Sequence, residues 1–214
     1  MTTSTPGPEI LAAALAARLI HDISGPASGI ITGLDLQADS DDPALRASGL
    51  ALAADGARSL LDMLDVCRVA FGASGGSQSA QTLERLTATC FAGRRAKLAW
   101  SPQNTTFDAA ASRSILLLCQ IGAAGLGGGG VAELSANRPA TDWRIQIDGR
   151  GPRAALPAEA IEGLAGREPD GGVAGRWAPA RYLRAVTDSA SGKVSWESLA
   201  DGFRVAVIVP AELA

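Results

Sequence analysis

Hydrophobic residues in the first third of the chain recur every three to four positions, which is the spacing of one face of an α-helix. The pattern predicts one helix over residues 9–38 and a second over residues 43–71. A short polar turn separates them, and an aspartate followed by Pro43 is typical of a helix start. Two such helices form a hairpin. Because two helices cannot enclose a core, we expect a homodimer whose two hairpins make a four-helix bundle.

The remainder of the chain has a different pattern, which begins after a Gly- and Ser-rich stretch that predicts a linker. Helical spacing and short apolar runs follow in irregular order, with a Gly- and Pro-rich turn after residue 148. The pattern predicts helices at 81–92, 112–126 and 178–190, and strands at 97–101, 131–135, 143–148, 193–197 and 203–209. This order favours an α+β sandwich with helices on one face of one sheet. We therefore expect a hairpin domain at 9–71, a linker at 72–80 and a sheet domain at 81–214.

Composition narrows the classes of function. Of the 214 residues, 47% are hydrophobic and only 4% are aromatic, so a large core must be built from aliphatic side chains. The formal net charge is −3 and the isoelectric point is about 5.2. Because nucleic-acid-binding proteins normally carry a basic face, this charge argues against a nucleic-acid partner.

The cysteines and the start of the chain favour a reducing, cytoplasmic location. Cys67, Cys90 and Cys119 are odd in number, fit no metal-binding spacing and lie in apolar segments, which predicts reduced thiols in the core. Residues 1–9 lack the basic region of a signal peptide. No uncharged apolar run reaches the roughly 18 residues that a membrane span needs, so we expect no membrane partner.

His21 is the only histidine of the chain, and it opens the run HDISGP at residues 21–26. Imidazole is the side chain best suited to act as a base or nucleophile near neutral pH. A proline inside a helix costs about 3 kcal/mol, and a purely structural helix has no reason to accept that cost beside its only histidine. Asp22 is placed to orient the ring or accept a proton. A structural histidine on a helix surface is the alternative.

Helical geometry gives His21 small and polar neighbours. Residues three and four apart lie side by side on a helix, which places Arg18, Ser24 and Gly25 next to His21 and Ser28 one turn further. The apolar residues around them occupy the other faces. The sequence therefore predicts that His21 points out of the bundle, with room for another protein to approach.

The run at residues 21–26 resembles the H-[DE]-x-x-x-P box of histidine-kinase dimerisation domains, whose histidine accepts a phosphoryl group. The second half of the chain resembles the ATP-binding domain of that family, an α/β sandwich of the Bergerat type. The similarity lies in the helix and strand at residues 182–198 and in the final strand at residues 203–210.

The motifs that hold nucleotide in that family are altered here. Ile121 stands where the family has its magnesium-binding asparagine, and an aliphatic side chain cannot bind magnesium. In the box at residues 148–153, Gly149 takes the place of the adenine-binding aspartate unless a one-residue shift brings in Asp148. The glycine-rich lid corresponds to residues 175–179, where bulky residues replace glycines that would hold phosphate.

A kinase-like histidine box beside a degenerate ATPase-like domain resembles the ChpT-type histidine phosphotransferases, over nearly the whole chain. The resemblance implies a two-component phosphorelay in which His21, with Asp22, takes a phosphoryl group from the receiver domain of a hybrid histidine kinase. It then passes the group to the receiver domains of response regulators. The protein needs no cofactor of its own, because Mg²⁺ is supplied by the partner receiver. We expect receivers to dock on an exposed surface formed by Arg18, Ser24, Gly25, Ser28, Leu64 and Arg68.

Two other functions remain open from the sequence. An atypical ATP-dependent histidine kinase would use the Asp148 register together with a metal ligand that we do not find. A non-catalytic dimeric module that binds response regulators would need no chemistry at His21.

Overall fold

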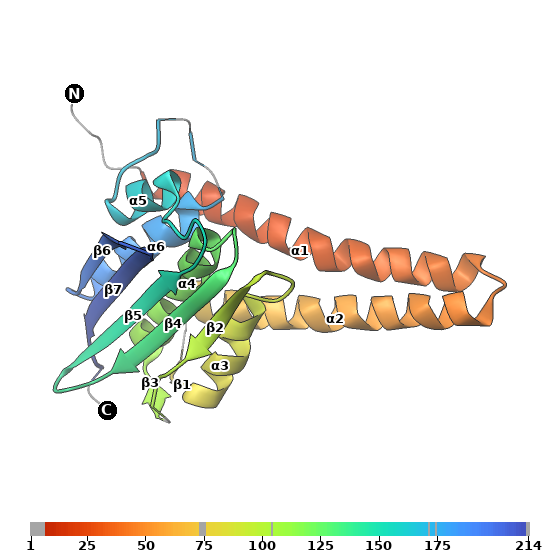
Figure 1. The fold of residues 1–214 in the computed structure, drawn as a ribbon, viewed down its shortest axis with the longest axis horizontal. Helices are drawn as coiled ribbons and strands as arrows, with labels where there is room; N and C mark the ends of the chain where they lie inside the picture. The colour runs from red at the N-terminus through yellow and green to blue at the C-terminus, as the bar shows by residue number, and fades with distance from the viewer. Residues whose placement is uncertain (1–6, 73–75, 104, 171, 174, 213–214) are drawn as a thin grey trace.

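The computed structural model describes the chain except for residues 1–6, 73–75, 104, 171, 174 and 213–214 (Figure 1). The middle of the predicted linker therefore lies outside the described residues. A long helical hairpin projects from a body of strands and helices. This arrangement confirms the predicted α+β class with an N-terminal hairpin.

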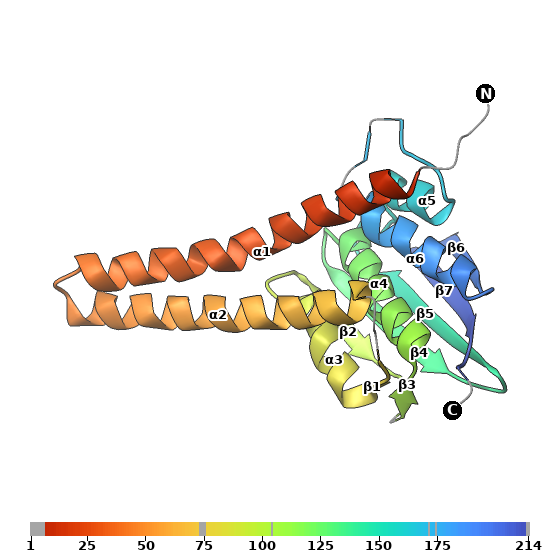
Figure 2. The ribbon, with the colours of Figure 1, turned by 180° about the vertical axis from the view of Figure 1, so that it is seen from behind.

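The hairpin consists of α1 (Pro8–Asp39) and α2 (Pro43–Phe71), close to the predicted bounds. The Asp42 carboxylate caps α2 by accepting a hydrogen bond from the backbone N–H of Ala44 at 2.8 Å. Helix α1 continues through Pro26. The two helices lie side by side near their connection and separate toward the body (Figures 1 and 2).

Small residues let the two helix backbones touch. A β-carbon added at Gly33 would lie 2.5 Å from the carbonyl oxygen of Gly49 and 2.6 Å from the backbone nitrogen of Ala53. A β-carbon added at Gly49 would lie 2.5 Å from the carbonyl oxygen of Gly33. No side chain fits between backbones at these separations, so the glycines set the spacing of the hairpin.

Replacing Gly33 with alanine is expected to lower the free energy of unfolding by about 1–3 kcal/mol, because the helices must move apart. Gly29→Ala is the matched control, since a β-carbon there meets no atom within 4 Å. Alanine should raise stability at that position by about 0.5–1 kcal/mol through helix propensity. Denaturant titration at one fixed protein concentration measures both changes. Equal effects of the two substitutions would contradict the close contact.

The body contains a five-stranded sheet in the order β2-β4-β5-β7-β6. Strands β2 and β4 are parallel and the other neighbours are antiparallel. The strands are β2 (Ala96–Trp100), β4 (Gly130–Asn137), β5 (Asp142–Arg150), β6 (Lys193–Leu199) and β7 (Gly202–Pro210). Helices α3 (Ala80–Thr89), α4 (Ala109–Gly125) and α6 (Trp177–Ser189) cover one face of this sheet (Figure 2). The predicted arrangement of helices on one face is confirmed.

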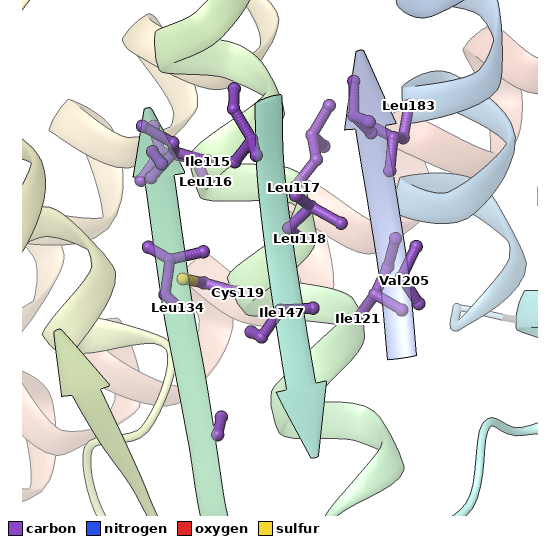
Figure 3. Packing of buried hydrophobic residues seen from close by; sticks show 14 of the residues in the cluster. Ile115, Leu116, Leu117, Leu118, Cys119, Ile121, Leu134, Ile147, Leu183 and Val205 are labelled. Carbon is purple, nitrogen blue, oxygen red and sulfur yellow. The ribbon is translucent and has the colours of Figure 1, made fainter. Parts of the chain in front are cut away.

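Helix α4 forms the centre of the core. It is buried along most of its length, and its aliphatic side chains meet inward-facing residues of the three central strands, among them Leu134, Ile147 and Val205 (Figure 3). Burial of this apolar surface is the main stabilising contribution to the domain. The opposite face of the sheet carries the alternate, more polar residues of each strand.

Three features of the body differ from the sequence prediction. Helix α5 (Ala158–Leu164) occupies a segment predicted as a turn, because seven residues are too few to show helical periodicity. Strands β1 (Gln78–Ser79) and β3 (Thr106–Phe107) form a small separate sheet. β1 and the first residue of α3 lie within residues 72–80, so part of the stretch that we assigned to the linker belongs to the body.

The base of the hairpin is built into the body. Val66, Val69 and Ala70 of α2 are at most 6% exposed and belong to the same hydrophobic cluster as α3 and α4. Arg85 of α3 also forms ion pairs with Asp62 and Asp65 of α2, at 2.5 and 3.3 Å. The hairpin and the sheet domain therefore share one core.

Candidate functional site

His21 lies near the middle of α1 with 85% of its side chain exposed. The ring is therefore exposed on the hairpin of the single chain, and its orientation in a four-helix bundle stays a prediction. Its location on the side of a long helix holds the backbone firmly while leaving the ring accessible to another protein.

A chain of polar contacts connects His21 to Arg18 through Asp22. The Nδ1 atom of His21 lies 3.1 Å from Oδ1 of Asp22. The second carboxylate oxygen of Asp22 accepts a hydrogen bond from Nε of Arg18 at 2.6 Å. The Arg18 and Asp22 side chains are only 23% and 22% exposed. The carboxylate is therefore held in place by the guanidinium and in turn orients the imidazole.

The contact with Asp22 determines which nitrogen of His21 can react. An ionised carboxylate can only accept a hydrogen bond, so Nδ1 carries the proton and donates it to Oδ1 of Asp22. In a neutral imidazole the other nitrogen, Nε2, then has a free lone pair. In this geometry Nε2 is the nitrogen available to act as a nucleophile.

A cavity of about 580 Å³ adjoins His21, between α1 and the segment that leads into α6. Its charged and titratable lining residues are Arg18, His21, Glu159 and Arg176. Nη1 of Arg18 donates a hydrogen bond to the carbonyl oxygen of Gly175 at 3.1 Å. The proximity of Glu159, Gly175 and Arg176 to His21 was not predicted from the sequence. No local pattern signals a contact between residues 157 positions apart.

The residues predicted to dock receivers are found in different environments. Gly25 and Ser28 are exposed, and a β-carbon added at Gly25 meets no atom within 4 Å. The Ser24 hydroxyl donates to the carbonyl oxygen of Ile20 at 2.7 Å, so its proton is used within the helix. Leu64 and Arg68 lie on α2 near the base of the hairpin. Leu64 is 45% exposed. The Arg68 side chain is 76% exposed and pairs with Asp65 at 2.6 Å. Their role in docking stays a prediction.

The altered nucleotide motifs have structural roles in this chain. Ile121 is 2% exposed and packs beneath the sheet (Figure 3). Trp177, in the lid-like segment, is fully buried, and its Nε1 donates to the carbonyl oxygen of Arg167 at 2.7 Å. Neither side chain can bind phosphate or magnesium.

Asp148 does not face the helices. Ile147 points into the core, so the alternation of the strand puts Asp148 on the opposite face of the sheet. There its two carboxylate oxygens accept hydrogen bonds from Nε and Nη2 of Arg204, both at 2.8 Å, and Gln146 donates a third at 3.0 Å. The hydrogen bond and charge of Asp148 raise the pKa of the Arg204 guanidinium, which therefore stays charged. The geometry does not fit an adenine-binding role for this carboxylate.

We also considered metal-binding clusters and the cysteine thiols as candidate sites. The described residues include no group of three or more His, Cys, Asp or Glu side chains arranged to hold a metal ion. The three cysteines are free, and Cys119 is fully buried. Burial raises the pKa of the Cys119 thiol well above its ordinary value, so the thiol stays protonated and unreactive at neutral pH.

Comparison with known proteins assigns the family. The family model described as "Histidine phosphotransferase C-terminal domain" matches residues 80–202, which is more than half of the chain. The chain belongs to the histidine phosphotransferase family. The match does not include α1. The choice of His21 as the candidate nucleophile of this histidine phosphotransferase therefore rests on the box at residues 21–26 and on the contact of its ring with Asp22.

Among solved structures, one with a similar fold matches this histidine phosphotransferase over the hairpin as well as the sheet domain. The structure of a bacterial phosphotransferase covers 96% of this chain and 98% of its own, with a TM-score of 0.80 and 22% sequence identity. The kinase domain of a blue-light activated histidine kinase from Erythrobacter litoralis covers 86% of this chain and 96% of its own, with a TM-score of 0.49 and 13% identity. A search of curated proteins found no match. The first structure establishes that hairpin and sheet domain together form a known fold.

Proposed function

We propose that this histidine phosphotransferase is a phosphorelay intermediate that carries phosphoryl groups between receiver-domain aspartates through His21 and does not bind ATP. The observation that carries the proposal is the exposed imidazole whose Nδ1 contacts Asp22, which leaves Nε2 free. A transfer protein acting on other proteins needs such an accessible nucleophile on a rigid support. We propose that it works in the cytoplasm as a homodimer.

In the forward step, the Nε2 lone pair attacks the phosphorus atom of the aspartyl phosphate in line. The N–P bond forms as the P–O bond to the aspartate breaks, and the receiver aspartate leaves as a carboxylate. The ring then carries a positive charge, with its proton still on Nδ1 and hydrogen-bonded to Asp22. Attack by the aspartate of a second receiver reverses these bonds and restores the neutral ring. The Mg²⁺ of each receiver offsets the phosphoryl charge.

Docking on the α1 surface is expected to depend on the open space at Gly25. Gly25→Trp adds a large side chain where a β-carbon meets no neighbour, so the protein should fold normally. The bulk should obstruct an approaching receiver and reduce the rate of transfer by at least about tenfold. Rapid-quench measurement of transfer from a phosphorylated receiver tests this, with Gly29→Ala as the folded control. Transfer at the wild-type rate would mean that receivers dock on a different surface.

Three observations support a lack of ATP binding. Asp148 is paired with Arg204, Ile121 is buried in the core, and Trp177 is buried at the start of α6. Calorimetric titration with Mg-ATP is therefore expected to show no heat of binding. A dissociation constant in the micromolar range would contradict the proposal and support the atypical kinase.

One reconstituted experiment separates the three candidate functions. The protein is incubated with labelled ATP alone, and then with a phosphorylated donor receiver and a fresh acceptor receiver. A phosphotransferase gains no label from ATP but moves label from donor to acceptor. A kinase gains label from ATP alone, and a binding module gains none in either case.

A further inference from the structure

The segment that corresponds to the ATP lid of histidine kinases is fixed beside His21. On one side of Arg176, the carbonyl oxygen of Gly175 accepts a hydrogen bond from Arg18 of α1 at 3.1 Å. On the other side, Trp177 is fully buried and hydrogen-bonded to Arg167. The backbone of Arg176 is therefore held between two anchored neighbours.

Arg176 lines the same cavity as His21. This cavity, of about 580 Å³, also contains Arg18 and the carboxylate-bearing Glu159. Within the described residues, Arg176 makes no ion pair, whereas Arg18 already binds Asp22 and Gly175 through Nε and Nη1. A guanidinium has five N–H donors, so both arginines retain donors for an anion in the cavity.

We propose that Arg176 is a phosphoryl-binding residue, which joins Arg18 in holding the phosphoryl group on His21 and thereby gives the lid-derived segment a role in phosphotransfer. This inference rests on the proposed function, because it requires that His21 be phosphorylated. A guanidinium matches the oxygens of a phosphoryl group and stabilises the negative charge that they carry during transfer. Glu159, which also lines the cavity, limits its net positive charge.

The phosphohistidine itself provides the first test, without any receiver. Phosphoramidate phosphorylates histidine chemically, and phosphorus NMR then follows the pH titration of the phosphoryl group. A nearby guanidinium favours the doubly ionised form, so Arg176→Ala should raise the pKa of the phosphoryl group by about 0.5 unit or more. Arg176→Lys should restore much of the difference. Glu159→Gln removes a negative charge from the cavity and should shift the pKa in the opposite direction.

Arg144→Ala is the matched control, because Arg144 is an exposed residue of β5 that lies outside this cavity and its loss changes the net charge by the same amount. It should leave the titration unchanged. Equal shifts for Arg144→Ala and Arg176→Ala would mean a general charge effect and would overturn the proposal, as would no shift for Arg176→Ala.

Transfer kinetics provide the second test. Loss of one phosphoryl-binding guanidinium should reduce the rate of transfer at saturating receiver by about tenfold, with the KM for the receiver nearly unchanged. A rise in KM alone would mean that Arg176 only contacts the receiver, and would overturn the proposal. The proposed function fails separately, if the wild-type protein transfers no label. Normal transfer by Arg176→Ala leaves that function intact and removes only the role of Arg176.

Discussion

Replacing His21 with alanine is expected to abolish phosphoryl transfer completely. The chain has no second histidine to take over the reaction. The ring is 85% exposed and contributes little to the core, so the variant should fold and melt as the wild type does. The large effect on activity with almost no effect on stability is the signature of a catalytic side chain.

The stability of the bound label in acid and in base identifies the type of residue that carries it. A phosphoramidate on imidazole is acid-labile and stable in base, unlike an aspartyl phosphate. After incubation with a phosphorylated receiver, the wild-type protein should carry label with this profile, and His21→Ala should carry none. Asp22→Asn should slow transfer without preventing phosphorylation, because the amide weakens the alignment of the ring but leaves Nε2 in place. Acid-labile label on His21→Ala would refute the relay and leave a binding module.

Replacing Leu34 with aspartate is expected to separate the proposed homodimer into monomers. Large apolar side chains on both hairpin helices lie open to solvent in the single chain, including Ile31 at 59%, Leu34 at 46%, Leu50 at 53% and Leu61 at 65% exposure. A second copy would cover these side chains and complete a four-helix bundle. An unpaired charge buried in that interface costs several kcal/mol, which is enough to shift the equilibrium to the monomer.

Light scattering measures this effect directly. The wild type should have about twice the chain mass of 21.7 kDa, and Leu34→Asp should have the mass of one chain. Asn137→Asp introduces the same charge at an exposed site on β4, outside the hairpin, and should remain dimeric. A wild-type protein that is monomeric at micromolar concentration would contradict the expectation.

The composition of α1 bears on the same question. Among the described residues, it is the one helix long and apolar enough to cross a membrane by length and composition, and little of it is buried in the single chain. Arg18 interrupts its apolar run, so a search for an uncharged run does not single it out. A helix whose apolar face packs on a second copy has the same composition, so the mass measurement in the absence of detergent is the informative one.

The sequence was sufficient to predict long helices, whose residues are close together in the chain. The spacing of apolar residues predicted both hairpin helices within one residue of their observed ends, since helical periodicity is repeated over many turns. It did not predict α5, which has seven residues, or the two-residue strands β1 and β3. Such short elements are stabilised by contacts made with the rest of the body, which leave no periodic pattern in their own sequence.

The α+β class, the hairpin and the candidate nucleophile could be predicted from the sequence, because each depends on residues close together in the chain. His21, Asp22 and Arg18 are neighbours on one helix, so helical geometry alone brings them together. The folded chain was needed to see that Asp148 faces away from the helices and pairs with Arg204, 56 residues away. It likewise brought Arg176 to the cavity beside His21. The first contact follows from the pairing of β5 with β7, and the second from how α6 packs against α1. Pairing and packing between distant segments are encoded by the whole core and not by a local motif.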